Sequence, residues 1–241
     1  VVGLVGSEMC IRDRTDTGAV TADRVVMASN AWTPEIGEPG NKLFAFGVTL
    51  FETQPLSAEQ LSVIGGWPGR EGIYTAHESL LSYRLTAART IIGGSKHVRY
   101  FYGGKPGTRS GEENASVMAN LSEFRDRFPE LHDLDFAHAW SGWIGMTMNF
   151  MPIIGESTRY SGLSFGVGYN GHGVAQALTV GRLLAERIQG HRNEWCDLMS
   201  RKPAYLPPEP LRWLGVHGLL AVVNGIDAHR NRQILRKGIG R

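Results

Sequence analysis

The middle of the chain alternates short apolar stretches with turn-forming residues. Between Leu43 and Gly94 the apolar stretches read KLFAFGVTLFETQ, GIYTA, SLLSYRLT and RTIIGG, and glycine, proline or serine lies between them. Short strands at this spacing are typical of an antiparallel sheet. We therefore expect an antiparallel sheet over this region.

Two later segments change to a helical period. Ser110 and Glu113 form an S-x-x-E capping box, which predicts a helix over 110–128. A second helix is predicted from about His172 to Ile188, and Gly190 is placed to end it. The expected apolar face of the first helix is Val117, Met118, Leu121, Phe124 and Phe128, and that of the second is Val174, Leu178, Gly181, Leu184 and Ile188.

Short strands flank this central region. Thr15–Ser29 reads as a hairpin that leads into an apolar strand at Val25–Ala28, and GLSFGVG at 162–168 reads as another strand. The order strand, antiparallel sheet, helix, strand, helix predicts an α/β fold with an inserted antiparallel sheet. After Pro210 one more helix is expected, either docked on the protein or, as the alternative, lying at a membrane interface.

Composition narrows the function classes. The 241 residues are 42% hydrophobic, enough for one large domain or two modest ones, and the net charge of +2 does not indicate nucleic-acid binding. The 2 cysteines provide no disulfide framework, which favours a reducing compartment such as the cytoplasm. No apolar run approaches the roughly 20 residues of a membrane span. His132 and His138 have no companion ligands at metal-binding spacing, so no metal site is expected.

The first residues, VVGLVGSEMC, resemble the strand and glycine turn of a dinucleotide-binding domain only superficially. Gly3 and Gly6 are spaced G-x-x-G, no third glycine follows, and residues 7–14 have no helical apolar stripe. The string is similar to a translated sequencing adapter, and the chain has no initiator Met. We expect residues 1–14 to be non-native and the chain to be an open-ended fragment; the alternative is a real surface segment.

The segment LSFGVGYNGHGVAQALTVGRLLAERI contains the most informative turn. A strand that ends in glycines leads directly into a helix, whose N-terminal N–H groups attract negative charge. Gly168, Gly171 and Gly173 would allow a flat ligand to approach the backbone. The alternative is a tight turn whose glycines serve packing alone.

Several motifs in order resemble flavoproteins of the D-amino-acid-oxidase superfamily. VVMASNAW (25–32), WIGMTMNFMPIIGE (143–156) and GYNGHGV (168–174) match stretches of its FAD-binding domain. VTLFETQPL and YRLTAARTIIGG match its substrate-domain strands, and LPPEPLRW is similar to the tail of its gamma-glutamylputrescine-oxidase-like branch. Each motif is weak alone, but their joint order is hard to obtain by chance.

The resemblance implies the C-terminal part of a two-domain flavoprotein, with a Rossmann-like FAD-binding domain and a substrate domain. Residues 15–36 would be a partial FAD-binding domain, 37–135 the substrate domain, 136–200 the return to the FAD-binding domain, and 201–241 a tail with a helix. In this family the G-x-G-x-x-G turn that holds the FAD pyrophosphate lies near the N-terminus, in sequence that this chain does not contain.

The resemblance also implies site residues. Arg84 is expected to bind a substrate carboxylate, unless it forms a structural ion pair, and Trp143 to wall the pocket, unless it is a core aromatic. His172 is expected to shape the turn and to form hydrogen bonds, with no role as a base, and no catalytic residue is assigned. The expected FAD contacts are Ala28, Asn30, Trp32, Gly142, Gly168, Tyr169, Asn170, Gly171, His172, Gly173 and Val174. Because Ala139–Ile153 contains no Cys, we expect the FAD to be non-covalent.

The implied reaction is oxidation of a small amine or amino acid, similar to gamma-glutamylputrescine, to an imine. Molecular oxygen then reoxidises the flavin and yields hydrogen peroxide. One alternative is a dehydrogenase that passes electrons to another acceptor. The other is an inactive fragment or binding module that lacks the nucleotide half.

Overall fold

The chain divides into two compact units whose segments alternate along the sequence. The computed structural model describes residues 3–6, 11–14, 17–94, 97–107, 112–191, 193–200 and 204–236. Unit 1 comprises Val1–Phe46, Phe101–Pro106 and Trp143–Trp213, and unit 2 comprises Gly47–Tyr100, Gly107–Gly142 and Leu214–Arg241. Each unit has its own sheet and its own apolar core.

Unit 1 begins with a small antiparallel sheet. Strand β2 (Ile11–Arg14) pairs with β1 (Gly3–Gly6) on one side and with β3 (Ala19–Ala22) on the other. The strand that follows β1 in the described residues is antiparallel to it, so Gly3 and Gly6 do not open a strand-to-helix dinucleotide turn. The prediction of a hairpin within Thr15–Ser29 is wrong, because β3 pairs with the preceding strand β2 and β4 belongs to another sheet. Thr15 and Asp16 lie outside the described residues.

The second sheet of unit 1 is an α/β layer of order β10-β11-β4. β11 (Leu163–Val167) is parallel to β4 (Val25–Met27) and antiparallel to β10 (Ile153–Glu156). The strands predicted at 25–28 and 162–168 are therefore confirmed. After β4 the chain forms the 3-10 helix η1 (Asn30–Ile36).

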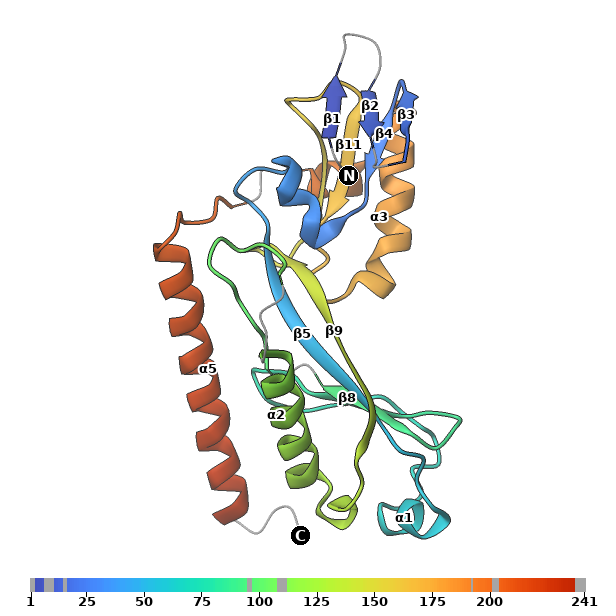
Figure 1. Cartoon of the computed structure of the whole chain (residues 1–241), viewed down its shortest axis with the longest axis vertical. Helices are drawn as coiled ribbons and strands as arrows, with labels where there is room; N and C mark the ends of the chain where they lie inside the picture. Colours follow the sequence, from blue (N-terminus) through green and yellow to red (C-terminus); the bar gives the residue numbers. More distant parts are fainter. Residues whose placement is uncertain are drawn as a thin grey trace. The chain divides into compact units, whose positions relative to one another are not determined.

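Two helices pack on this sheet, and Figure 1 shows the longer one, α3 (Gly173–Ile188), beside β4 and β11. It matches the predicted helix, and Gly190, at φ 84°, follows its end as expected. The predicted face is partly wrong, because Val174 and Leu178 are exposed while the buried side chains are Val180, Leu183 and Leu184. Helix α3 has small or apolar residues around most of its circumference, so periodicity alone does not reveal which side the sheet covers. The short helix α4 (Glu194–Met199) was not predicted.

Unit 2 is built on a five-stranded sheet of order β6-β7-β8-β5-β9, and β5 and β9 each begin in one unit and end in the other. The pairs β6–β7, β7–β8 and β8–β5 are antiparallel, which confirms the predicted antiparallel sheet. The short helix α1 (Ala58–Val63) interrupts it and was not predicted. The strand bounds are β5 Phe44–Thr53, β6 Ile73–Tyr74, β7 Ser82–Leu85, β8 Ile91–Gly94 and β9 Phe136–Met146.

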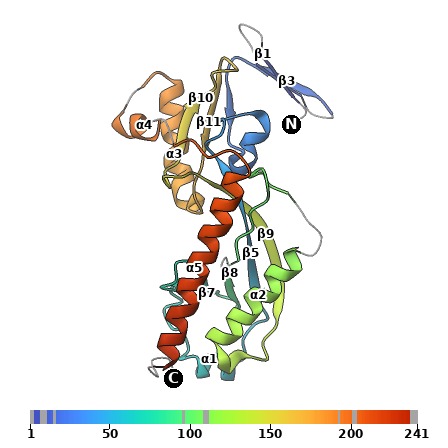
Figure 2. The same ribbon diagram turned by 90° about the vertical axis from the view of Figure 1, so that its left-hand side faces the viewer.

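An aromatic cluster joins this sheet to helix α2 (Glu112–Arg127), which Figure 2 shows lying along the sheet. Phe51 lies 5.6 Å from Phe124, ring centre to ring centre. The predicted helix is confirmed, although Met118 is exposed and Ser110, the predicted cap, lies outside the described residues. After α2 comes the 3-10 helix η2 (Pro129–Leu131).

The predicted tail helix is α5 (Leu211–Arg236), and within unit 2 it docks on the loop before β7. The buried Asp227 carboxylate accepts hydrogen bonds from the backbone N–H groups of Glu78 at 2.9 Å and Ser79 at 3.0 Å. These contacts favour a tail helix that docks on the protein over the alternative of a helix at a membrane interface. Within the described residues, no helix has the length and apolar character needed to cross a membrane.

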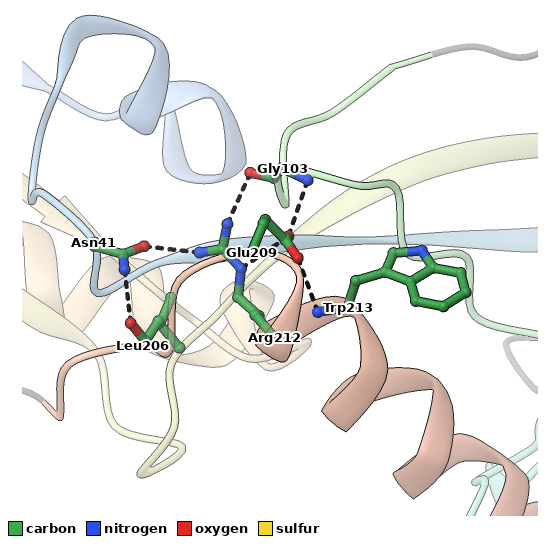
Figure 3. Close-up of polar contacts among 6 residues, drawn as sticks. All are labelled: Asn41, Gly103, Leu206, Glu209, Arg212 and Trp213. Carbon is green, nitrogen blue, oxygen red and sulfur yellow. Dashed lines mark hydrogen bonds and ion pairs between the residues drawn. The ribbon is translucent and has the colours of Figure 1, made fainter.

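A buried polar network holds the start of α5 within unit 1 (Figure 3). Arg212 donates to Asn41 Oδ1 at 2.7 Å and to the carbonyl of Gly103 at 3.1 Å, and it pairs with Glu209 at 3.2 Å. The Glu209 carboxylate accepts from the backbone N–H groups of Gly103 and Trp213, both at 2.9 Å. The network therefore ties three segments that are distant in sequence.

We expect Arg212→Gln to lower the free energy of unfolding by about 3 kcal/mol, because it leaves a buried carboxylate without its countercharge. The Arg212 and Glu209 side chains are only 10% and 11% exposed. The matched control is Arg230→Gln, in a pair with Glu78 that is 48% and 49% exposed. This control should cost less than about 1 kcal/mol. Urea denaturation followed by tryptophan fluorescence measures both, and equal losses would contradict the prediction.

Candidate functional site

The turn between β11 and α3 requires glycine at one position above all. Gly168, Asn170 and Gly171 have φ values of 79°, 52° and 86°, a region that favours glycine and tolerates asparagine. A Cβ on Gly168 would also lie 2.6 Å from Thr147 Cγ2. Gly171 has more room, since its Cβ would lie 3.7 Å from Ile144 Cδ1, and Gly173 has ordinary contacts with Tyr169.

Two asparagine side chains hold this turn in place. Asn30, from the segment after β4, accepts a hydrogen bond from Gly168 N at 2.9 Å. The Asn170 side chain accepts from Thr147 N at 2.8 Å, and its own backbone N–H donates to Gly145 O at 3.0 Å. The ends of β4 and β9 thereby fix the conformation of the turn.

The fixed turn presents backbone donors. The N–H groups of Gly171, Gly173 and Val174 have no hydrogen-bond acceptor among the residues that the structure describes. They lie at the N-terminus of α3, a 16-residue helix whose dipole adds partial positive charge there. The turn can therefore bind a negatively charged or acceptor-rich edge of a ligand.

Most of the other predicted FAD contacts lie in unit 1 without joining this donor group. Ala28 and Tyr169 line an apolar cleft of about 330 Å³ between α3 and the sheet. Burial raises the pKa of Tyr169, whose hydroxyl donates to Gly166 O at 3.2 Å. Trp32 on η1 is half exposed, and His172 precedes α3 as its N-cap without a side-chain capping bond.

The two predicted substrate residues have different surroundings. Trp143 packs edge-to-face on Phe101, with ring centres 5.2 Å apart. Arg84 lies on β7 in unit 2, where it lines a cleft of about 490 Å³ with Arg70. Gly142 belongs to the unit 2 segment of β9, and no atom lies within 4 Å of where its Cβ would be.

Sequence reasoning missed Arg70. It follows the turn GGWPG, which signals only a loop, so no sequence feature distinguished it. In the described part of the chain, the guanidinium groups of Arg70 and Arg84 have no ion-pair or hydrogen-bond partner, so the alternative of a structural ion pair for Arg84 finds no support. The described residues contain no cluster of three His, Cys, Asp or Glu side chains suited to a metal.

Known proteins share both sequence and fold with the chain. It is 29% identical over 198 residues to a probable oxidoreductase OrdL of Haemophilus influenzae, covering 79% of this chain and 41% of that protein. It is 28% identical over 195 residues to the gamma-glutamylputrescine oxidoreductase of Escherichia coli strain K12, covering 80% and 42%. The crystal structure of L-proline dehydrogenase from P. horikoshii superposes with a TM-score of 0.63 at 22% identity, covering 83% and 52%.

The chain therefore spans about two-fifths of the length of these curated relatives. The sequence family described as DAO, FAD dependent oxidoreductase, matches residues 1–187. This match covers most of the chain and contains both the α/β layer and the inserted antiparallel sheet. The chain belongs to the FAD-dependent oxidoreductase (DAO) family.

Proposed function

We propose that the chain supplies the flavin-ring side and the substrate domain of an oxidoreductase that acts on a small amine or amino acid. The observation that carries the proposal is the set of free N–H groups at Gly171, Gly173 and Val174. When bound, FAD accepts the two electrons removed from the substrate. We place residues 15–36 and 136–200 in the FAD-binding domain, 37–135 in the substrate domain and 201–241 in the tail.

The donor set fits the flavin ring. The pyrimidine edge of a flavin offers carbonyl acceptors and gains negative charge on reduction, and preorganised N–H donors stabilise such charge. Glycine at 171 and 173 leaves the backbone accessible to a flat ring. Asn30 and Asn170 would act through the turn, by holding its donors in a fixed direction.

The substrate side is proposed to use Arg84 and Trp143. A guanidinium group without a protein partner can bind a carboxylate through two parallel hydrogen bonds. The indole ring of Trp143, which packs on Phe101 within unit 1, would offer an apolar surface to a substrate. We place the protein in the cytoplasm, with non-covalent FAD.

Two kinds of electron acceptor are compatible with this proposal. Molecular oxygen would make the protein an oxidase that releases hydrogen peroxide, whereas another carrier would make it a dehydrogenase. A peroxide assay on a full-length protein that contains this chain, with oxygen as the only acceptor, distinguishes them. A chain that acts only as a binding module would show no substrate-dependent flavin reduction in either assay.

The turn itself can be tested with Gly171→Val in a full-length protein that contains the chain. The valine would occupy space in front of the free N–H groups and displace them from their acceptor. Losing one such donor costs roughly 3 kcal/mol, which corresponds to about a hundredfold. We expect either a loss of flavin occupancy, measured by absorbance, or flavin reduction that is about a hundredfold slower in stopped flow.

Gly190→Val is a matched control, because Gly190 lies beyond the other end of α3 with nearly the same φ, 84° against 86°. No atom lies within 4 Å of its Cβ position, so the variant carries the same backbone strain without touching the turn. It should lower stability and leave flavin reduction unchanged. If Gly171→Val leaves flavin content and reduction rate unchanged, the turn serves packing alone.

The 241-residue chain by itself is expected not to retain FAD. The sequence has one G-x-G-x-x-G string, at 166–171, and we assign that turn to the flavin ring, so the flavin-ring side alone would have to immobilise a flexible dinucleotide. Purification with added FAD, followed by gel filtration and absorbance near the flavin bands, measures retention. Stoichiometric binding would refute this expectation.

In a full-length protein, denaturation is expected to release all of the flavin. No Cys occurs in Ala139–Ile153, and Cys196 is buried on α4, where its thiol is 3.9 Å from Leu183 O. Acid precipitation separates bound from released flavin. Flavin that stays with the precipitate would show a covalent link and contradict the expectation.

A further inference from the structure

One buried threonine contacts the turn between β11 and α3 at two of its positive-φ residues. Thr147 directly follows β9 and is 1% exposed. Its methyl carbon Cγ2 lies 2.6 Å from the position that a Cβ on Gly168 would take. Its backbone N–H donates to Asn170 Oδ1 at 2.8 Å. Thr147 therefore packs against Gly168 and also holds the side chain of Asn170.

The hydroxyl of Thr147 also closes the loop between β9 and β10. It lies 2.9 Å from Met151 O and 3.3 Å from Asn170 Oδ1, and its single proton favours the nearer acceptor, Met151 O. The carbonyl of Thr147 accepts from Phe150 N at 3.3 Å. Phe150 has a φ of 56°, which a bulky residue keeps only where the surroundings fix its backbone. Thr147 thus holds this loop on one side and the turn on the other.

The position of Asn170 determines where the free N–H groups point. Gly171 follows Asn170 directly, and the N–H groups of Gly173 and Val174 come next at the start of α3. A shift of the Asn170 side chain therefore displaces the donors that follow it. Thr147 is buried and uses its own polar atoms within the protein, so it can affect a ligand only through the turn.

We propose that Thr147 is a positioning residue for the flavin, whose hydroxyl keeps the free N–H groups of the turn aimed at the flavin's pyrimidine edge. The inference rests on the proposed function, in which this turn contacts the flavin. Reduced flavin carries more negative charge at that edge than oxidised flavin, so donors held in a fixed direction favour the reduced form. Thr147 therefore raises the reduction potential of the flavin without touching it.

Two substitutions separate the hydroxyl of Thr147 from its methyl group. Thr147→Val places a methyl group where the hydroxyl lies, 2.9 Å from Met151 O. Carbon and oxygen ordinarily approach no closer than about 3.3 Å, so the loop or the turn has to move. Thr147→Ser keeps the hydroxyl and removes only the methyl group. The proposal requires valine to disturb the turn and serine to preserve it.

Hydrogen exchange on the 241-residue chain without FAD measures whether Thr147 holds the turn. The Gly168 N–H donates to Asn30, and the Asn170 N–H donates to Gly145 O, so both amide protons are protected while the turn keeps its conformation. We expect both to exchange about tenfold faster in Thr147→Val and at the wild-type rate in Thr147→Ser. Unchanged exchange in Thr147→Val would overturn the proposal.

The flavin midpoint potential of a full-length protein that contains the chain is the second measurement, and it requires no substrate. We expect Thr147→Val to lower the preference for reduced over oxidised flavin about tenfold, which for a two-electron couple is a potential about 30 mV more negative. Loss of FAD from Thr147→Val alone would also support the proposal. Thr147→Ser should keep the wild-type potential.

Thr49→Val is the matched control. Thr49 is also 1% exposed, and its hydroxyl makes one hydrogen bond, to Ser141 Oγ at 2.9 Å, within unit 2. This variant should lose stability in thermal unfolding and leave the potential and the exchange of the turn unchanged. A potential shift as large in Thr49→Val as in Thr147→Val would overturn the proposal, because the potential would then follow stability alone.

A variant that removes the hydroxyl without the close contact covers the case in which valine prevents folding. Thr147→Ala should change exchange and potential in the same direction as valine, and wild-type values for both would overturn the proposal. The two measurements also distinguish a failure of this inference from a failure of the proposed function. Faster exchange with an unchanged potential would show that the turn does not meet the flavin, which refutes both. Unchanged exchange refutes the role of Thr147 and leaves the turn to be tested by Gly171→Val.

Discussion

The hydrogen bonds of two asparagine side chains set the geometry on which the proposed flavin site depends. A turn with three residues at positive φ is costly unless the surrounding structure satisfies its polar groups. Asn30 accepts from Gly168 N, and Asn170 connects the turn to Thr147 and Gly145. Because these contacts use the polar groups on one side of the turn, the N–H groups at the start of α3 remain free for a ligand.

In unit 2, too, a single buried side chain fixes the conformation of a loop through hydrogen bonds. The Asp227 carboxylate caps two backbone N–H groups of the loop before β7, and Trp67 anchors the loop that presents Arg70. Buried polar groups that are fully hydrogen-bonded specify a single arrangement. In both units, a hydrogen-bonded side chain thus fixes the conformation of the backbone segment that it contacts.

The candidate site was only partly predictable from the sequence. The glycine turn, Asn30 and Arg84 were singled out because their motifs resemble those of a flavoprotein family. Arg70 was not, since an arginine in a glycine-rich loop has no periodicity and no motif. Its place beside Arg84 arises from the pairing of β6 with β7 and from the burial of Trp67, neither of which a local pattern contains.

The sequence by itself determined the strands β4 and β11, the antiparallel central sheet and the helices α2 and α3, because hydrophobic period, capping residues and glycine stops act locally. Tertiary structure alone decided that β4 and β11 are parallel neighbours and which side of α3 is buried. It also decided that Arg70 and Arg84 line one cleft. These outcomes depend on contacts between residues far apart in the chain, where packing and hydrogen-bond satisfaction override local preference.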